Sequence, residues 1–254
     1  MLCAQHGADV VKVESLEGDW ARVLGQRYGD LSAFSLIYNR GKRSLSVDMK
    51  DAQACAAVRQ MAMQADVIIE AFRPGVMTRF GLDDASLRKG NPGVIYVSVT
   101  GFGTAGPLAT APATDAILQA FTGLMHSNKD AEGKPQRIDL IVIDVVTGLY
   151  AFQAIATALL ARHRHGTPGL HIDCSLMKSA IAMQAGKIVE NHIEAGDRAM
   201  YVPLGVFATR DGHISLSVRR DDHCVRLCTA LGRSDLTEGG RYATGAQRVE
   251  RAHE

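Results

Sequence analysis

Two aspartates stand at positions where a carboxylate could do chemistry. Asp144 lies between the apolar run 140–143 and a long apolar stretch that begins at Val145. We expect it at the start of that helix, where it either accepts a backbone N–H as an N-cap or serves as a fixed carboxylate beside backbone donors that could hold an oxyanion. Asp115 opens the preceding predicted helix in a similar way. This pattern alone leaves both the structural and the catalytic interpretation open.

Other catalytic patterns in the sequence are weak. Gly101-x-Gly103-x-x-Gly106 directly follows a predicted strand, as a dinucleotide-binding loop does. Pro107 and Pro112 keep this segment from opening a helix, so the sequence favours a flexible loop that covers a ligand over a nicotinamide site. The nucleophile-elbow, P-loop and His-Glu-x-x-His motifs do not occur, and the five cysteines lack zinc-ligand spacing. No metal site is therefore expected.

The elements that must position these residues alternate along the chain. Short β-branched runs predict strands over 10–13, 44–47, 67–70, 94–100 and 171–174. Helical patterns cover 52–64, 85–89, 116–125, 145–165 and 176–193. This alternation is typical of an α/β fold with a doubly wound sheet. The last two helices are apolar nearly all round, so we expect them to be buried on several sides or in a subunit interface.

The character of the sequence changes after residue 195. Gly196-Asp197-Arg198 predicts a linker, and the runs 206–209 and 213–218 predict a hairpin that turns at Arg210-Asp211-Gly212, followed by a helix over 222–231. We expect a large domain over 1–195, and a linker with the start of a small α+β domain over 196–254. Because the chain opens like the last turn of a helix, we also expect the large domain to lack its first strand.

Length and charge argue against some classes of function. The 254 residues carry a net charge of +1, whereas a general nucleic-acid binder needs a surplus of Lys and Arg on one face. The longest apolar run, 140–160, contains polar residues, so no membrane span is expected. No leader pattern opens the sequence, which predicts a cytoplasmic protein.

Several ordered motifs resemble the family III coenzyme A transferases, also called the CaiB/BaiF family. They are NRGKRSLSVDMK at 39–50, ADVIIEAFRPGV at 65–76 and SVTGFG at 98–103, and the match continues through Asp144, 148–149, 169–173, 205–207 and 211–212. The resemblance implies a Rossmann-like large domain, a small domain, and a homodimer in which two ring-shaped chains are interlocked.

The resemblance also implies the transfer of coenzyme A from an acyl-CoA donor to a carboxylic acid. An aspartate attacks the donor thioester to give an acyl-aspartyl anhydride, and the released CoA thiolate converts this into an aspartyl-CoA thioester. The acceptor then takes CoA by the reverse steps, so covalent catalysis divides one difficult exchange into easier ones. The position that matches this aspartate is Asp144. Acyl-CoA enters as a substrate, and no metal is implied.

Positions that match CoA contacts of the family follow the strands and precede the helix of Asp115. They are Val47, Lys50, Ala71, Phe72, Arg73, Arg79, Thr114 and Asp115. Lys50, Arg73 and Arg79 suit the phosphates of the nucleotide, although solvated surface cations would look the same in a sequence. Ala71 stands where the family usually has asparagine, which removes one polar side chain.

Two alternatives to the transferase are open. Family members begin with a strand before the position of Met1 and continue beyond that of Glu254, so a non-catalytic, truncated remnant is one alternative. The other is an enzyme like the 2-methylacyl-CoA racemases, which share the fold. Those enzymes carry a histidine base where this chain has Thr114, and a threonine hydroxyl cannot serve as that base near neutral pH.

Overall fold

The chain forms two compact units, Met1–Ala185 and Gly186–Glu254. The computed structural model describes residues 1–130, 132–193, 199–252 and 254. The predicted linker Gly196-Asp197-Arg198, and with it the predicted domain boundary after residue 195, lie outside the described residues.

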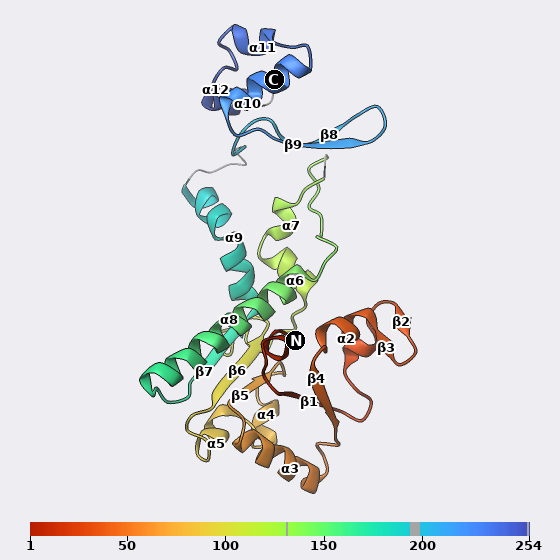
Figure 1. Cartoon of the computed structure of the whole chain (residues 1–254), viewed down its shortest axis with the longest axis vertical. Helices are drawn as coiled ribbons and strands as arrows, with labels where there is room; N and C mark the ends of the chain where they lie inside the picture. The colour runs from red at the N-terminus through yellow and green to blue at the C-terminus, as the bar shows by residue number, and fades with distance from the viewer. Residues whose placement is uncertain (131, 194–198, 253) are drawn as a thin grey trace. The chain divides into compact units, whose positions relative to one another are not determined.

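Parallel strands form the scaffold of the larger unit (Figure 1). They are β1 (Val10–Glu14), β4 (Lys42–Ser46), β5 (Val67–Glu70), β6 (Ile95–Thr100) and β7 (His171–Ser175). β1 pairs with β4 in one sheet, and β6 lies between β5 and β7 in another. Val97 of β6 lies opposite Ile69 on one side and Ile172 on the other. The five predicted strands are confirmed within two residues at each end.

Helices cover both faces of the three-stranded sheet. They are α8 (Val142–His165) on one face, and α3 (Ala52–Met63), α4 (Val76–Arg79) and α5 (Asp84–Arg88) on the other. Val97 packs into a cluster with Ile155 of α8, whereas its neighbour Tyr96 packs with Val58 of α3 and Leu87 of α5. Successive side chains of a strand point to opposite faces, so β6 carries both layers of the core. The predicted α/β class is confirmed.

The helices around the two aspartates differ from their predicted bounds. The segment predicted as one helix over 116–125 forms α6 (Asp115–Phe121) and α7 (Leu124–Ser127). Gly123 separates them with a φ of 80°, a conformation that glycine adopts at little cost. α8 begins at Val142, three residues before its predicted start, whereas α9 (Leu176–Ile193) has the predicted bounds.

Helix α8 buries only one stripe of its surface in this chain. Its buried residues follow each other at intervals of three or four and are Ile143, Thr147, Ala151, Ile155 and Ala158. By length and composition the helix also meets the requirements for a membrane span, contrary to the expectation from its polar interruptions. Its packing against β6 and β7 is that of a core helix in an α/β layer.

Shorter elements complete the larger unit. They are α1 (Leu2–Gln5), the 3₁₀-helix η1 (Trp20–Val23), β2 (Arg27–Tyr28), β3 (Leu31–Ser32) and α2 (Ala33–Tyr38). The segment that holds Gly101, Gly103 and Gly106 has no helix before Asp115, which confirms the prediction of a loop.

Among its described residues, the smaller unit contains the end of α9, the predicted hairpin and three further helices. The hairpin strands are β8 (Leu204–Ala208) and β9 (His213–Ser217), and the helices are α10 (Asp221–Ala230), α11 (Asp235–Glu238) and α12 (Gly245–Glu250). Arg248 of α12 is 3% exposed. Its guanidinium donates to the carbonyl oxygens of Val202, Tyr242 and Ala243 and to the carboxylate of Asp221. This one side chain therefore ties α12 to α10 and to the segment before the hairpin.

Candidate active site

Asp144 is the third residue of α8 and not its N-cap. Ile141 occupies the N-cap position, and its side chain makes no capping bond. Of the two interpretations that the sequence leaves open for Asp144, the N-cap is therefore excluded. Its side chain is not needed to satisfy the helix backbone, and the residue is exposed to solvent.

The cap of α8 comes instead from Asp115, the first residue of α6. Its Oδ2 accepts the backbone N–H of Ile143 at 2.7 Å and that of Asp144 at 3.1 Å. A helix leaves its first N–H groups without internal partners, and the buried Asp115 carboxylate satisfies two of them. Asp115 thus occupies both of these N–H donors. The sequence had suggested that donors at this helix start could hold an oxyanion, and these two do not.

The same arrangement changes the acidity of Asp144. Desolvation of the carboxyl by the surrounding protein, and then the negative charge of Asp115, raise the pKa of Asp144 to about 6. The residue as a whole is nevertheless exposed. At neutral pH the group is mostly ionised, and it is a stronger base than an ordinary surface aspartate. A carboxylate of this kind is suited to act as a nucleophile.

Asp115 bonds to the Asp144 backbone at the contact between α6 and α8, and Thr114 precedes Asp115 in the chain. Thr114 is the N-cap of α6, and its Oγ1 accepts the backbone N–H of Ile117 at 3.4 Å. The Asp115 carboxylate points into the protein toward α8. A contact of this turn with CoA, as the family resemblance implies, would have to use Thr114 or the backbone.

The other predicted CoA contacts lie on segments that follow the parallel strands. Val47 and Lys50 follow β4, residues 71–73 follow β5, and Arg79 ends α4. Val47 is half-buried and the rest are exposed. Among the residues that the structure describes, Lys50, Arg73 and Arg79 form no ion pair. Their charges are available to a ligand.

The structure brings two of these residues together at a cavity of about 380 Å³. Phe72 and Arg73 line its wall, and Ser98 and His171 contribute to its lining from β6 and β7. The hydroxyl of Ser98 lies 2.9 Å from Nε2 of His171. This pair could not be singled out from the sequence, because the two residues are 73 positions apart. Val47, Lys50, Arg79 and Asp144 do not line the cavity.

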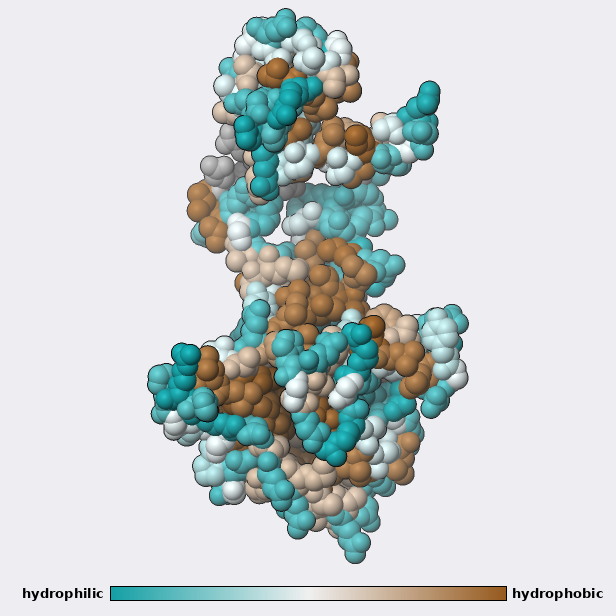
Figure 2. Space-filling view, viewed as in Figure 1, coloured by the Kyte–Doolittle hydropathy of each residue, from teal (hydrophilic) through white to brown (hydrophobic). Residues whose placement is uncertain are grey.

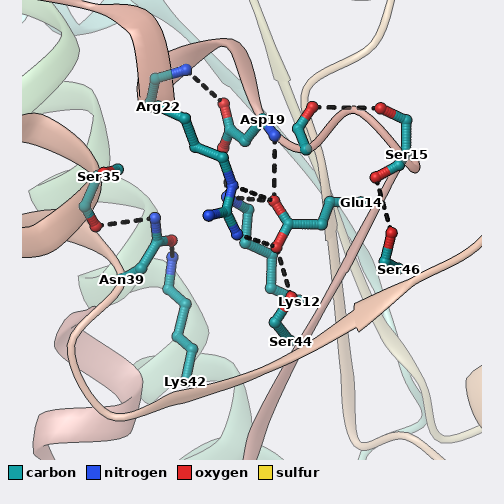
Figure 3. Close-up of polar contacts among 12 residues, drawn as sticks. Lys12, Glu14, Ser15, Asp19, Arg22, Ser35, Asn39, Lys42, Ser44 and Ser46 are labelled. Atoms are coloured by element: carbon teal, nitrogen blue, oxygen red, sulfur yellow. Dashed lines mark hydrogen bonds and ion pairs between the residues drawn. The ribbon is translucent and has the colours of Figure 1, made fainter. Parts of the chain in front are cut away.

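A polar network at the end of β1 was also not predicted (Figure 3). Glu14 is buried and accepts hydrogen bonds from the Arg22 guanidinium, the Ser44 hydroxyl and the backbone N–H of Asp19. The Arg22 hydrogen bonds lead the interactions that hold the pKa of Glu14 down at about 2. Lys12 forms ion pairs with both Glu14 and Asp19. The network braces β1 against β4, which precedes Val47 and Lys50.

Within the described part of the chain, no group of three or more His, Cys, Asp or Glu side chains is arranged to hold a metal ion.

The sequence matches CoA-transferase family III over residues 1–254. The chain belongs to this family. It is 37% identical to the succinate–glutarate CoA-transferase of Agrobacterium fabrum, over 98% of this chain and 66% of that protein. It is 35% identical to the acetyl-CoA:oxalate CoA-transferase of Acetobacter aceti, over 96% of this chain and 64% of the relative.

Solved structures agree with this family assignment. The fold matches the crystal structure of a CaiB/BaiF family protein from Brucella suis with a TM-score of 0.83 and 33% identity, over 99% of this chain and 69% of the other. Among the curated relatives, the succinyl-CoA:glutarate CoA-transferase of Homo sapiens is matched over 58% of its length. The chain therefore spans less than two thirds of the length of these curated relatives.

Proposed function

We propose that this chain is the larger part of an enzyme that transfers coenzyme A from an acyl-CoA to a carboxylic acid, with Asp144 as the nucleophile. The proposal rests on the exposure, the raised pKa and the position of the Asp144 carboxylate. In a chain of CoA-transferase family III, this residue is exposed, has a raised pKa and stands on a helix start that another residue caps.

The proposed reaction is a sequence of acyl transfers. A carboxylate oxygen of Asp144 attacks the thioester carbon, the C–S bond breaks, and the CoA thiolate leaves an acyl-aspartyl anhydride behind. The thiolate then attacks the aspartyl carbonyl, which releases the donor acid and leaves an aspartyl-CoA thioester. The acceptor carboxylate attacks that thioester, which releases the CoA thiolate and forms a second anhydride between the acceptor and Asp144. The thiolate then attacks the acceptor carbonyl of this second anhydride and leaves with the acceptor acyl group as the new CoA thioester. Asp144 ends as a carboxylate, and no oxidation or reduction occurs.

The predicted CoA contacts support binding of the nucleotide end of the substrate. Lys50, Arg73 and Arg79 are exposed cations without ion-pair partners among the described residues. Phosphate oxygens bind such groups through charge-assisted hydrogen bonds, with arginine as a planar fork and lysine as a point charge. Phe72 is 56% exposed beside Arg73, so it offers an apolar surface next to the charge.

We further propose that the working protein is a homodimer in the cytoplasm. Hydrophobic side chains gather on the surface over α6 and α8 in Figure 2. On these two helices, the large hydrophobic side chains of Phe121, Val145, Leu149 and Tyr150 are each more than a third exposed. Exposed apolar patches of this kind usually mark an interaction surface. Light scattering on a size-exclusion column would give twice the mass of one chain if the dimer forms.

A transfer assay tests the proposed function. The chain is incubated with acetyl-CoA or succinyl-CoA and with glutarate or oxalate, and new CoA thioesters are measured by mass spectrometry. Asp144→Asn should abolish transfer because an amide is not a nucleophile here. Asp139→Asn is the matched control, because Asp139 pairs with Arg137 in the same segment and its side chain is 91% exposed. Equal activity of Asp144→Asn and the parent chain would refute the assignment.

Binding of CoA separates the enzyme from a non-catalytic remnant. A transferase should show an increased melting temperature with CoA, since a ligand that binds only the folded state stabilises it. Arg73→Ala should weaken this shift and raise the KM for acyl-CoA, while kcat stays close to that of the parent chain. A folded chain whose melting temperature ignores CoA would favour the remnant.

A further inference from the structure

Gln119 is a fully buried amide on α6, one turn beyond Asp115. We propose that Gln119 is a positioning residue that fixes where α8 begins and therefore where Asp144 stands. Its consequence for catalysis rests on the proposed function of Asp144, whereas its effect on the helix start does not.

All hydrogen-bonding atoms of the Gln119 amide have partners. Nε2 donates to Asp115 Oδ1 at 2.6 Å and to the carbonyl oxygens of Ile138 and Leu140 at 3.1 and 3.2 Å. Oε1 accepts the backbone N–H of Ile138 at 2.9 Å. The amide NH₂ has two protons for three acceptors, so one proton is shared. A single side chain thus holds both ends of the backbone segment 138–140.

This segment leads directly into α8, and the carboxylate that Gln119 holds is the one that caps α8. Asp115 and Gln119 are four residues apart and lie on the same face of α6. The order of contacts is Gln119 to Asp115, and Asp115 to the N–H groups of Ile143 and Asp144. Because Gln119 is 0% and Asp115 7% exposed, water cannot easily replace either partner. Loss of the amide would leave the 138–140 carbonyls and the capping carboxylate without their shared donor.

Gln184 of α9 provides a matched control within the same unit. It is also buried, and its Nε2 donates to Thr122 Oγ1 at 3.0 Å and to the carbonyl oxygen of Ala180 at 3.1 Å. It therefore ties α9 to the end of α6 by the same kind of bond. None of its hydrogen bonds reaches the segment 138–144. Substitution of either glutamine by methionine keeps the side-chain length and removes the hydrogen bonds.

The test measures hydrogen exchange and kinetics in parallel on the whole chain. Exchange of the backbone amides in peptides that cover residues 138–146 is followed by mass spectrometry for the parent, Gln119→Met and Gln184→Met. We expect Gln119→Met to speed exchange of the amides at 143 and 144 by about tenfold or more, with little change in Gln184→Met. In the transfer assay, kcat of Gln119→Met should fall by about tenfold or more while the KM for acyl-CoA changes less than about threefold.

Gln119→Glu gives a readout that a general loss of packing would not change. A glutamate of the same size can still accept the backbone N–H of Ile138. When ionised, however, its carboxylate faces the Asp115 carboxylate and two carbonyl oxygens, and it has no proton to donate to them. Only the protonated glutamate can donate a hydrogen bond there. Its activity relative to the parent should therefore rise as the pH falls, in protein that circular dichroism reports as folded at each pH.

The outcomes distinguish the positioning role of Gln119 from the proposed transfer of CoA. Unchanged exchange at 143 and 144 in Gln119→Met, or equally faster exchange in both methionine variants, would overturn the positioning role. If exchange separates the two variants but the parent chain transfers no CoA, the proposed function fails and the positioning of α8 stands. A kcat that falls equally in Gln119→Met and Gln184→Met would overturn the catalytic consequence.

Discussion

Replacement of Asp115 by alanine should destabilise the larger unit by about 3 kcal/mol. The change removes a buried carboxylate that accepts the N–H groups of Ile143 and Asp144. A hydrogen bond to a charged group contributes about 1.5–3 kcal/mol, so two such bonds give about 3 kcal/mol at the lower bound. This lies just above the range of about 0.5–2 kcal/mol for the loss of an ordinary N-cap, which is reasonable because Asp115 is 7% exposed and water cannot take its place.

The assay is urea unfolding followed by far-UV circular dichroism, compared between the parent chain and Asp115→Ala. At this size the loss corresponds to roughly 6–12 °C in melting temperature, at about 2–4 °C per kcal/mol. The matched control is Asp139→Ala, an aspartate in the segment before α8 whose side chain is 91% exposed and whose loss should cost less than about 0.5 kcal/mol. A loss below about 1 kcal/mol in Asp115→Ala, or one equal to that of the control, would show that Asp115 does not hold the start of α8.

Four further predictions concern the pKa of Asp144, the burial of Arg248 and the backbone at Gly169. The reaction of Asp144 with acyl-CoA should reach half its maximal rate near pH 6, because the pKa of its carboxyl is raised from 3.8 to about 6 and only the carboxylate attacks; a flat rate from pH 5 to 8 would contradict this. The raised pKa also means that the folded state keeps a proton which the unfolded state loses, so stability should fall as the pH rises from about 4 to about 6, and Asp144→Asn should remove that slope in urea titrations. Arg248→Ala should unfold the smaller unit or destabilise it by at least about 3 kcal/mol, seen as a lost or lowered thermal transition, since the guanidinium is buried with four acceptors. Gly169→Ala should be far less stable than Gly148→Ala in the same melt, because a Cβ at Gly169 would lie 2.0 Å from the carbonyl oxygen of Val94 whereas one at Gly148 meets nothing within 4 Å; equal stability would be inconsistent with this backbone contact.

The layers of the fold could be predicted because they depend on local patterns. The β-branched run that forms β6 and the apolar stretch of α8 both leave a periodic trace in the sequence. Gly123 ended α6 earlier than predicted, since a glycine with positive φ stops a helix that the apolar pattern alone would continue. The division of the parallel strands between two sheets has no such local trace.

The chemistry of the site could be predicted only in part, because its decisive contacts are tertiary. Asp144 was identified from its place between apolar segments, but the capping carboxylate comes from Asp115, 29 residues earlier. A sequence pattern points to the nearest suitable side chain as a cap, so Asp144 stood as a candidate cap beside its catalytic interpretation, and only the structure excludes the cap. Gln119 was missed for the same reason. The spacing Asp115-x-x-x-Gln119, on one face of a predicted helix, is the sequence feature that could have drawn attention to it.

The roles of the surface cations could also be predicted only in part from the sequence. Lys50, Arg73 and Arg79 could be distinguished from solvated charges only by the family motifs around them. Their positions after β4, after β5 and at the end of α4 fit a ligand that runs along the ends of parallel strands. The sequence does not encode which of them share a cavity, and only Arg73 lines the cavity beside Phe72.

We propose that Asp144 forms a covalent intermediate with acyl-CoA. The most direct measurement is to incubate the chain with acyl-CoA, add hydroxylamine or borohydride, and analyse the peptides by mass spectrometry. We expect an aspartyl hydroxamate or a reduced side chain at Asp144, with no such product at Asp115 or Asp139. An unmodified Asp144 in protein that demonstrably binds CoA would contradict its role as the nucleophile.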